Sequence, residues 1–161
     1  MSPSNYESLV ASLVRGFRCE RFAADVIDVR GGKTNLIPGG SGYTHQIDVS
    51  VRSKSRLLLI ECKLLKGYAG VNSVLVHRSR IMDVCEANPE LEVLGSIVST
   101  KRPTAGAWLL AKYYGIRLDT ARDVGDYAIS IGSEVFGIKS AVVSTSATLE
   151  LKVIRKSETD G

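Results

Sequence analysis

The chain has 161 residues, of which 44% are hydrophobic and 24% charged, and it carries a net charge of +4. This length suits one domain with a sizeable core, and the mild positive charge permits a polyanionic partner without requiring one. The aromatic share of 6% disfavours a surface that binds nucleic acid by stacking bases on many rings.

The cysteines and the apolar runs narrow the setting further. The three cysteines are odd in number and show no CxxC spacing, which disfavours a disulfide framework and a zinc knuckle. Cys62 and Cys85 lie in apolar runs and are expected to be buried, and a reducing cytoplasm is the simplest location. No apolar stretch approaches the roughly 18 residues of a membrane span. We therefore expect a cytoplasmic protein with no membrane contact and no organic cofactor.

The first third of the chain predicts a helix followed by extended segments. Residues 4–15 have apolar residues on one helical face after a possible cap at Ser4, and Gly16 ends this helix. A strand is expected over residues 25–29, and glycines break the chain on either side of residues 33–37. Two alternating strands follow, over residues 46–52 and 57–64, and the polar link between them is suited to a hairpin turn.

The remainder of the chain predicts alternating helices and strands. A helix is expected over residues 71–88, a buried strand over 93–98, a helix from Pro103 or Thr104 to Tyr114, and a short strand over 116–118. The inner stripe of the first of these helices is expected to comprise Val74, Leu75, Ile81, Met82 and Cys85. Three β-rich runs lie between residues 127 and 154. This order predicts an α/β domain around a mixed sheet.

The register of the predicted hairpin brings two acids together. The short link pairs residues of the two strands as follows: Val51 with Leu58, Val49 with Ile60, Asp48 with Glu61, and Gln46 with Lys63. Directly opposed residues have Cβ atoms roughly 4.5–5.5 Å apart, and two carboxylates that close repel unless a proton or a cation lies between them. Mg²⁺ prefers one or two carboxylates together with water and phosphate oxygens. Lys63 projects on the same face as Glu61, where an ammonium can orient water or neutralise developing charge.

A solvated polar strand face that carries Asp, Glu and Lys by chance is the alternative interpretation. However, Leu57 and Leu59 precede Glu61 on the same face, so this strand is apolar on both faces, as a central strand would be. Charged residues in such a strand favour a functional explanation, and a metal site supplies one.

The strings THQIDV and IECK resemble the D-x(n)-(D/E)-x-K signature of the PD-(D/E)XK nuclease superfamily. Within this superfamily they most resemble the Mrr-type group. The string YESLVASLVRGF resembles the opening helix of the family, and residues 93–118 resemble its later strand, helix and strand. The resemblance implies an α/β fold, restriction endonuclease-like, with a mixed central sheet flanked by helices and extra C-terminal β strands. One nuclease-like domain would span residues 1–161, with a core at about 4–118 and a C-terminal β extension at about 125–155.

The resemblance also implies roles for individual residues. Asp48 and Glu61 match the metal-binding carboxylates, Lys63 matches the catalytic lysine, and the main-chain carbonyl of Cys62 matches a further metal ligand. Glu7 matches an acid on the opening helix that helps to hold the metal or its water. The metal implied by the resemblance is Mg²⁺, with Mn²⁺ as a substitute. Two departures are visible. Ile47 replaces the usual Pro, and no Gln occurs in residues 66–88, where Mrr-type members often carry one.

Several of these residues have structural alternatives. Glu7 could instead complete a capping box with Ser4, and Trp108 fits a core or dimer contact better than a base-stacking position. Candidate contacts to nucleic acid are the cationic or polar residues near the site: Lys101, Arg102, His77, Arg80, His45 and Gln46. For His45 the alternative is a structural hydrogen bond, and for His77 and Arg80 it is a solvated helix face.

The expected function is metal-dependent hydrolysis of DNA phosphodiester bonds by a restriction endonuclease-like enzyme. A single domain would need a second copy to cut both strands, so a homodimer is expected. The alternatives are a structure-selective resolvase or repair nuclease, and a DNA-binding module of the same fold that has lost catalysis.

Overall fold

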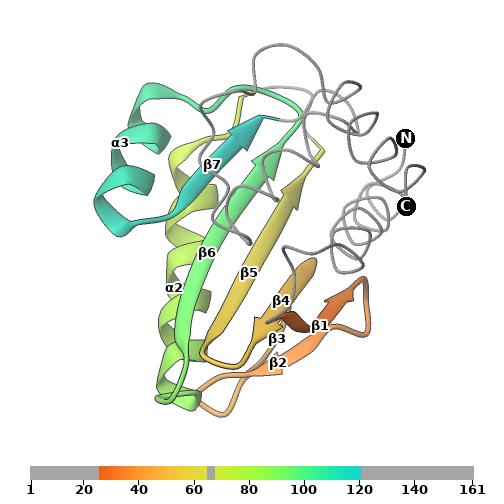
Figure 1. Cartoon of the computed structure of the whole chain (residues 1–161). Coiled ribbons are helices and arrows are strands. Elements are labelled where there is room, and N and C mark those ends of the chain that lie inside the picture. Colours follow the sequence, from red (N-terminus) through yellow and green to blue (C-terminus); the bar gives the residue numbers. More distant parts are fainter. Residues whose placement is uncertain (1–25, 65–67, 121–161) are drawn as a thin grey trace, which may run out of the picture.

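The computed structural model describes residues 26–64 and 68–120 of the chain. Within them a sheet has the strand order β1-β4-β5-β6-β7, and a smaller sheet pairs β2 with β3 (Figure 1). The elements in chain order are β1 (Val26–Gly31), β2 (Leu36–Pro38), β3 (Thr44–Gln46), β4 (Val49–Ser53), β5 (Arg56–Lys63), α2 (Val71–Ala87), β6 (Glu92–Ser99), α3 (Ala105–Tyr114) and β7 (Arg117–Thr120).

The larger sheet is mixed, because its two halves are connected differently. Strands β1, β4 and β5 are antiparallel neighbours, with Lys54 and Ser55 turning the chain between β4 and β5. Strands β5, β6 and β7 are parallel, and the connections between them run through α2 and α3. The α/β architecture with a mixed sheet flanked by helices, expected from the sequence, is confirmed. The expected helix at residues 4–15 and the C-terminal extension lie outside the described residues.

The hairpin register expected from the sequence is confirmed within β4 and β5, where Val49 pairs with Ile60 and Val51 with Leu58. The first strand is shorter than expected, however. The chain bends at Asp48, and Gln46 belongs to β3, where it pairs with Leu36. The expected pairing of Gln46 with Lys63 is therefore wrong.

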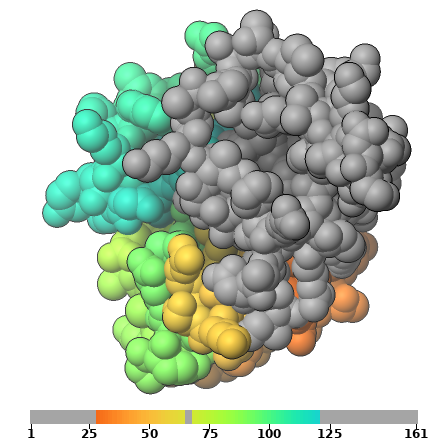
Figure 2. Space-filling view, viewed as in Figure 1, coloured from red at the N-terminus to blue at the C-terminus, as the bar shows by residue number. Residues whose placement is uncertain are grey.

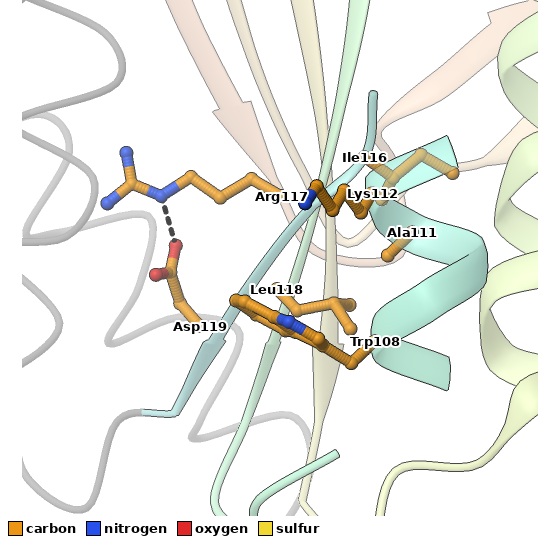
Figure 3. A pocket seen from close by; sticks show the side chains of 7 residues that line it. All are labelled: Trp108, Ala111, Lys112, Ile116, Arg117, Leu118 and Asp119. Carbon is orange, nitrogen blue, oxygen red and sulfur yellow. Dashed lines mark ion pairs between the residues drawn. The ribbon is translucent and has the colours of Figure 1, made fainter. Parts of the chain in front are cut away.

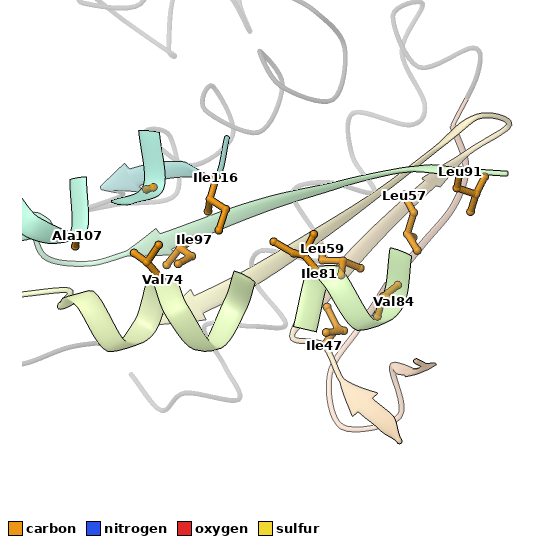
Figure 4. Packing of buried hydrophobic residues seen from close by; sticks show 11 residues of the cluster. Ile47, Leu57, Leu59, Val74, Ile81, Val84, Leu91, Ile97, Ala107 and Ile116 are labelled. Carbon is orange, nitrogen blue, oxygen red and sulfur yellow. The ribbon is translucent and has the colours of Figure 1, made fainter. Parts of the chain in front are cut away.

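The core fills the space between the sheet and the two helices (Figure 4). Its buried members are Ile47, Leu57, Leu59, Val74, Ile81, Val84, Leu91, Ile97, Ala107, Ala111 and Ile116. The other face of the sheet also carries buried apolar side chains, among them Val49, Ile60 and Val98. Strand β5 is thus buried on both faces, as expected for a central strand.

The inner stripe of α2 differs from the expected one. Its buried residues are Val74, His77, Ile81 and Val84, which recur at helical spacing on one face. The expected inner residues Leu75, Met82 and Cys85 are exposed. The apolar residues of this helix are spread around its circumference, and a histidine occupies the middle of the buried stripe.

Two local features fix the positions of the helices. Thr104 caps α3 by accepting a hydrogen bond from the Ala107 N–H at 3.2 Å, and Gly115 ends this helix in the left-handed conformation with φ 68°. Gly95 on β6 lets α2 approach closely, because a Cβ at this position would lie 2.2 Å from Cδ1 of Ile81.

Candidate active site

Glu61 lies on the helix-facing side of β5 and is only 5% exposed. Its Oε1 is 2.5 Å from Nζ of Lys63, which projects from the same strand two residues later. Its Oε2 accepts a hydrogen bond of 2.6 Å from Nη1 of Arg80 on α2. A buried carboxylate is costly unless it is paired and hydrogen-bonded, and here each oxygen has its own cation.

Asp48 joins this group from the bend just before β4. Its Oδ2 accepts a hydrogen bond of 2.7 Å from the main-chain N–H of Cys62, the residue between Glu61 and Lys63. The main chain of Asp48 also contacts the residue that follows β1, since its carbonyl accepts a hydrogen bond from the Gly32 N–H at 3.0 Å. Asp48 therefore reaches β5 through its side chain, from the bend that precedes β4.

Asn35 holds the bend that presents Asp48, and sequence reasoning missed it. This side chain is 2% exposed, and its Nδ2 donates to the Ile47 carbonyl at 2.8 Å. The Ile47 N–H in turn donates to the Asn35 carbonyl at 3.0 Å, and Ser50 Oγ donates to Asn35 Oδ1 at 3.1 Å. An asparagine beside Gly and Thr residues is typical of a turn, and no local signal marks it as buried.

His77 lies beneath the site and is 1% exposed. Its Nε2 is 3.2 Å from the Leu59 carbonyl, so this nitrogen carries the proton and donates. Burial lowers the pKa of His77 from 6.5 to about 4, although the nearby Glu61 carboxylate acts in the opposite direction. The ring is therefore neutral at neutral pH. The expected contact of His77 with nucleic acid is wrong, because a side chain with so little exposed surface cannot reach a phosphate.

Lys101 and Arg102 lie at the same end of the sheet as Lys63. Lys63 and Ser99 are paired neighbours on β5 and β6, and the Thr100 N–H donates to the Lys63 carbonyl at 3.1 Å. Lys101 and Arg102 follow directly and are both exposed. Their positions leave them available to a ligand that approaches the end of β5.

His45 takes part in a different cluster, which docks the β2–β3 hairpin onto α2. Its Nε2 is 2.6 Å from Oδ2 of Asp83, and Ser41 donates to the same carboxylate through its N–H at 2.7 Å and its Oγ at 2.8 Å. This is the structural hydrogen bond that formed the alternative for His45. Gln46 is exposed at the end of β3.

The donors at the site suit a magnesium ion in kind and number, with one condition. Asp48 and Glu61 provide hard oxygen ligands, and Mg²⁺ takes one or two carboxylates and fills the rest of its shell with water and phosphate. Among the described residues there is no group of three or more His, Cys, Asp or Glu side chains suited to a metal; Glu7 lies outside them. Glu61 would have to exchange one of its two cationic contacts for the metal.

A separate cavity of about 430 Å³ lies between α3 and β7 (Figure 3). It is lined by Trp108, Ala111, Lys112, Ile116, Arg117, Leu118 and Asp119. Trp108 is 54% exposed and is thus no core residue. In the space-filling view α3, drawn in teal, lies at the surface of the molecule (Figure 2). Leu109 and Tyr113 on the same helix are also exposed.

Comparisons with known proteins establish the fold. No protein family model matches the chain, and neither does any curated protein. Among solved structures, the chain is similar to AF1548, a protein of unknown function, with a TM-score of 0.54 and 15% identity over 92% of this chain and 78% of that one. Because its function is unknown, this likeness indicates a shared fold and nothing about activity.

Two further solved structures are similar with TM-scores below 0.5. The chain matches EndoMS in complex with double-stranded DNA with a TM-score of 0.49 and 17% identity, over 75% of this chain and 46% of that one. It matches the small subunit of the heterodimeric restriction endonuclease R.BspD6I with a TM-score of 0.47 and 12% identity, over 96% and 78%. The chain thus spans about half the length of the EndoMS chain.

Among the described residues, no helix has the length and apolar character needed to cross a membrane. The expected fold class, an α/β domain with a mixed sheet flanked by helices, is the one observed.

Proposed function

We propose that this protein is a magnesium-dependent endonuclease that hydrolyses phosphodiester bonds in DNA. The observation that carries the proposal is the convergence of three residues on one short segment of β5. Glu61 is buried there, Lys63 lies 2.5 Å from it, and the Asp48 carboxylate is hydrogen-bonded to the main chain between them. A central strand buried on both faces gains no stability from a Glu and a Lys, so their presence favours a chemical role.

Each residue has a part in the proposed reaction. Asp48, Glu61 and the Cys62 carbonyl would hold the metal, with Glu7 as a further ligand, and Mn²⁺ could replace Mg²⁺. A bound metal ion would supply Lewis-acid stabilisation of the scissile phosphate and a more acidic water. The ammonium of Lys63 would orient a water molecule or neutralise charge on the phosphate. Lys101 and Arg102, exposed at the same end of the sheet, contact backbone phosphates and so position the DNA.

We propose a homodimer, because one domain has one site and cleavage of both strands of a duplex needs two. The proposed location is the cytoplasm. Cleavage assays on unmodified duplex, branched DNA and damaged DNA would identify the substrate class.

One observation favours a second candidate function, a DNA-binding module without catalysis. Glu61 already has two cationic partners, Lys63 and Arg80. A carboxylate between two cations is also found in purely structural ion-pair networks, which need no metal. The exposed Lys101 and Arg102 would serve DNA binding equally well in such a protein.

Incubation of the pure protein with plasmid DNA and Mn²⁺ or Mg²⁺ tests the proposal. We expect nicking or linearisation by the wild type and a loss of at least about 100-fold for Lys63→Ala. Lys112→Ala, which removes an exposed lysine on α3, is the matched control and should cut normally. A Mn²⁺ titration of Asp48→Ala separates the two candidates. Binding that is unchanged by this substitution would leave the DNA-binding module as the better description.

A further inference from the structure

The described side chains around Glu61 are balanced in charge without any metal. The carboxylates of Asp48 and Glu61 are matched by the cations of Lys63 and Arg80. His77 on α2, which the Glu61 carboxylate also affects, is neutral at neutral pH. The formal charge of this five-residue cluster is therefore zero, although the two acids and the lysine of the proposed active site would by themselves carry one negative charge.

A neutral cluster is a poor site for a free divalent cation. Entry of such an ion raises the formal charge of the cluster to that of the ion, in a region where Glu61 is 5% exposed and water screens little. A phosphate group that arrives at the same place would offset this charge. Binding of the metal and binding of the nucleic acid should therefore favour each other, and by linkage the effect must be mutual.

Arg80 is the residue that creates this balance, and the fold holds it in place. His77, one turn earlier on α2, is buried and donates to the Leu59 carbonyl. Leu59 and Glu61 are alternate residues on the same face of β5, so one helical turn of α2 contacts both. Gly95 permits this close approach, since a Cβ there would collide with Ile81. The backbone of Arg80 is thus anchored, while its side chain is 30% exposed and can change partner.

We propose that Arg80 is a positioning residue that occupies Glu61 in the nucleic-acid-free protein and so makes metal binding depend on nucleic acid. This inference rests on the proposed nuclease function. When DNA and metal are bound, the guanidinium exchanges Glu61 for a phosphate oxygen, a partner that suits its planar set of donors. No residue of this role was expected from the sequence, which indicated Arg80 only as a phosphate contact or a solvated side chain.

The test measures Mn²⁺ affinity of the full chain by calorimetry, with and without a phosphorothioate duplex that resists hydrolysis. Arg80→Gln removes the charge and keeps an N–H donor. Arg80→Met removes both the charge and the donor, and it replaces Arg80→Gln in the test if that variant folds poorly. Without DNA we expect Arg80→Gln to bind Mn²⁺ about tenfold more tightly than the wild type. The enhancement of Mn²⁺ binding by the duplex should shrink in the same variant. Arg80→Lys, which keeps the charge, should restore both values to near those of the wild type.

Arg52→Gln is the matched control. Arg52 lies on β4, is half-exposed, and is 4.0 Å from Glu90 at the far end of the sheet, so the loss of its charge should leave Mn²⁺ affinity unchanged. If the wild type cuts DNA but Arg80→Gln binds Mn²⁺ as the wild type does, the role of Arg80 is wrong and the nuclease stands. If the wild type binds no Mn²⁺ with or without duplex and cuts nothing, both proposals are wrong.

Discussion

Helix α2 contributes to two carboxylate clusters that differ in the kind of partner each acid has. Asp83 accepts hydrogen bonds from the N–H and Oγ of Ser41 and is 2.6 Å from His45. Glu61 has the long side chains of Lys63 and Arg80, each about one-third exposed. The partners of Asp83 are short groups close to the main chain of one hairpin, whereas those of Glu61 are flexible cations.

This difference separates a structural contact from a candidate reactive one. Short donors linked to the main chain cannot leave Asp83 without moving the hairpin, and the hydrogen bond from His45 is the largest of the contacts that lower the pKa of Asp83. Lys63 and Arg80 can rotate away from Glu61 while the backbone stays in place. A carboxylate that must exchange partners during a reaction needs the second arrangement.

The largest expected effect is on activity. Glu61→Gln should reduce DNA cleavage at least about 100-fold, because the amide is neutral and binds a dication poorly. Asp83→Asn should leave cleavage nearly unchanged and lower the melting temperature, because it weakens the docking of the hairpin. Cleavage assays and thermal unfolding of both variants measure the contrast. Loss of activity in Asp83→Asn at a temperature where it remains folded would contradict the division into structural and reactive clusters.

The pairing of the hairpin was predictable because it depends on local pattern. Alternating side chains and a short polar link leave few registers that keep Val49 and Val51 on one face with Leu58 and Ile60. The same pattern identified Glu61 and Lys63 as neighbours on one face of a central strand. The mixed sheet followed from the order of the elements, and the caps of α3 from Thr104 and Gly115.

The features that the sequence did not reveal depend on long-range contacts. The bend at Asp48 exists because Asn35, twelve residues before Ile47, bonds to both sides of the Ile47 main chain. The inner face of α2 includes His77 because the Leu59 carbonyl lies there and accepts a hydrogen bond from its ring N–H. Arg80 pairs with Glu61 for a similar reason. In each case a polar side chain is buried by a partner distant in sequence, and hydrophobic periodicity carries no information about such partners.

The second effect is on stability, and it separates the two clusters by pH. Because the pKa of His77 falls from 6.5 to about 4 on folding, the unfolded chain binds more protons than the folded one between these values. The stability of the fold should therefore decrease by about 3 kcal/mol as the pH falls through this range. His77→Gln keeps a donor for the Leu59 carbonyl and should remove this dependence. Urea unfolding at a series of pH values, with chelator present, measures it.

Asp83 acts in a lower range of pH. Its pKa is lowered below 3.8 in the fold, so its contribution is complete above that value and is lost as the pH falls below it. Asp83→Asn should therefore lower the free energy of unfolding at pH values above this range, and its effect should vanish in the most acidic part of the stability curve. A curve in which His77→Gln leaves the slope between pH 6.5 and 4 unchanged would show that His77 is charged in the fold.

The smallest effect tests how tightly the Asp83 cluster is packed. A Cβ added at Gly39 would lie 1.9 Å from Oδ2 of Asp83, so Gly39→Ala must displace that carboxylate from Ser41 and His45. We expect a fall in melting temperature of about 5 °C from this overpacking, with Mn²⁺ binding unchanged. Gly42→Ala is the control in the same loop. It has a positive φ of 85° but open space around the added atom, so it reports backbone strain alone.

A double substitution decides whether the clash acts through Asp83. When Asp83→Ala has already removed the carboxylate, the three atoms nearest to the methyl group at Gly39 are gone, and Gly39→Ala should cost little more. Strong non-additivity of the two substitutions is thus expected, whereas Gly42→Ala and Asp83→Ala should add. Additive effects for Gly39 and Asp83 would mean that the glycine is needed for its backbone and not for the space it leaves. The Asp83 cluster would then differ from that of Glu61 in its partners but not in its rigidity.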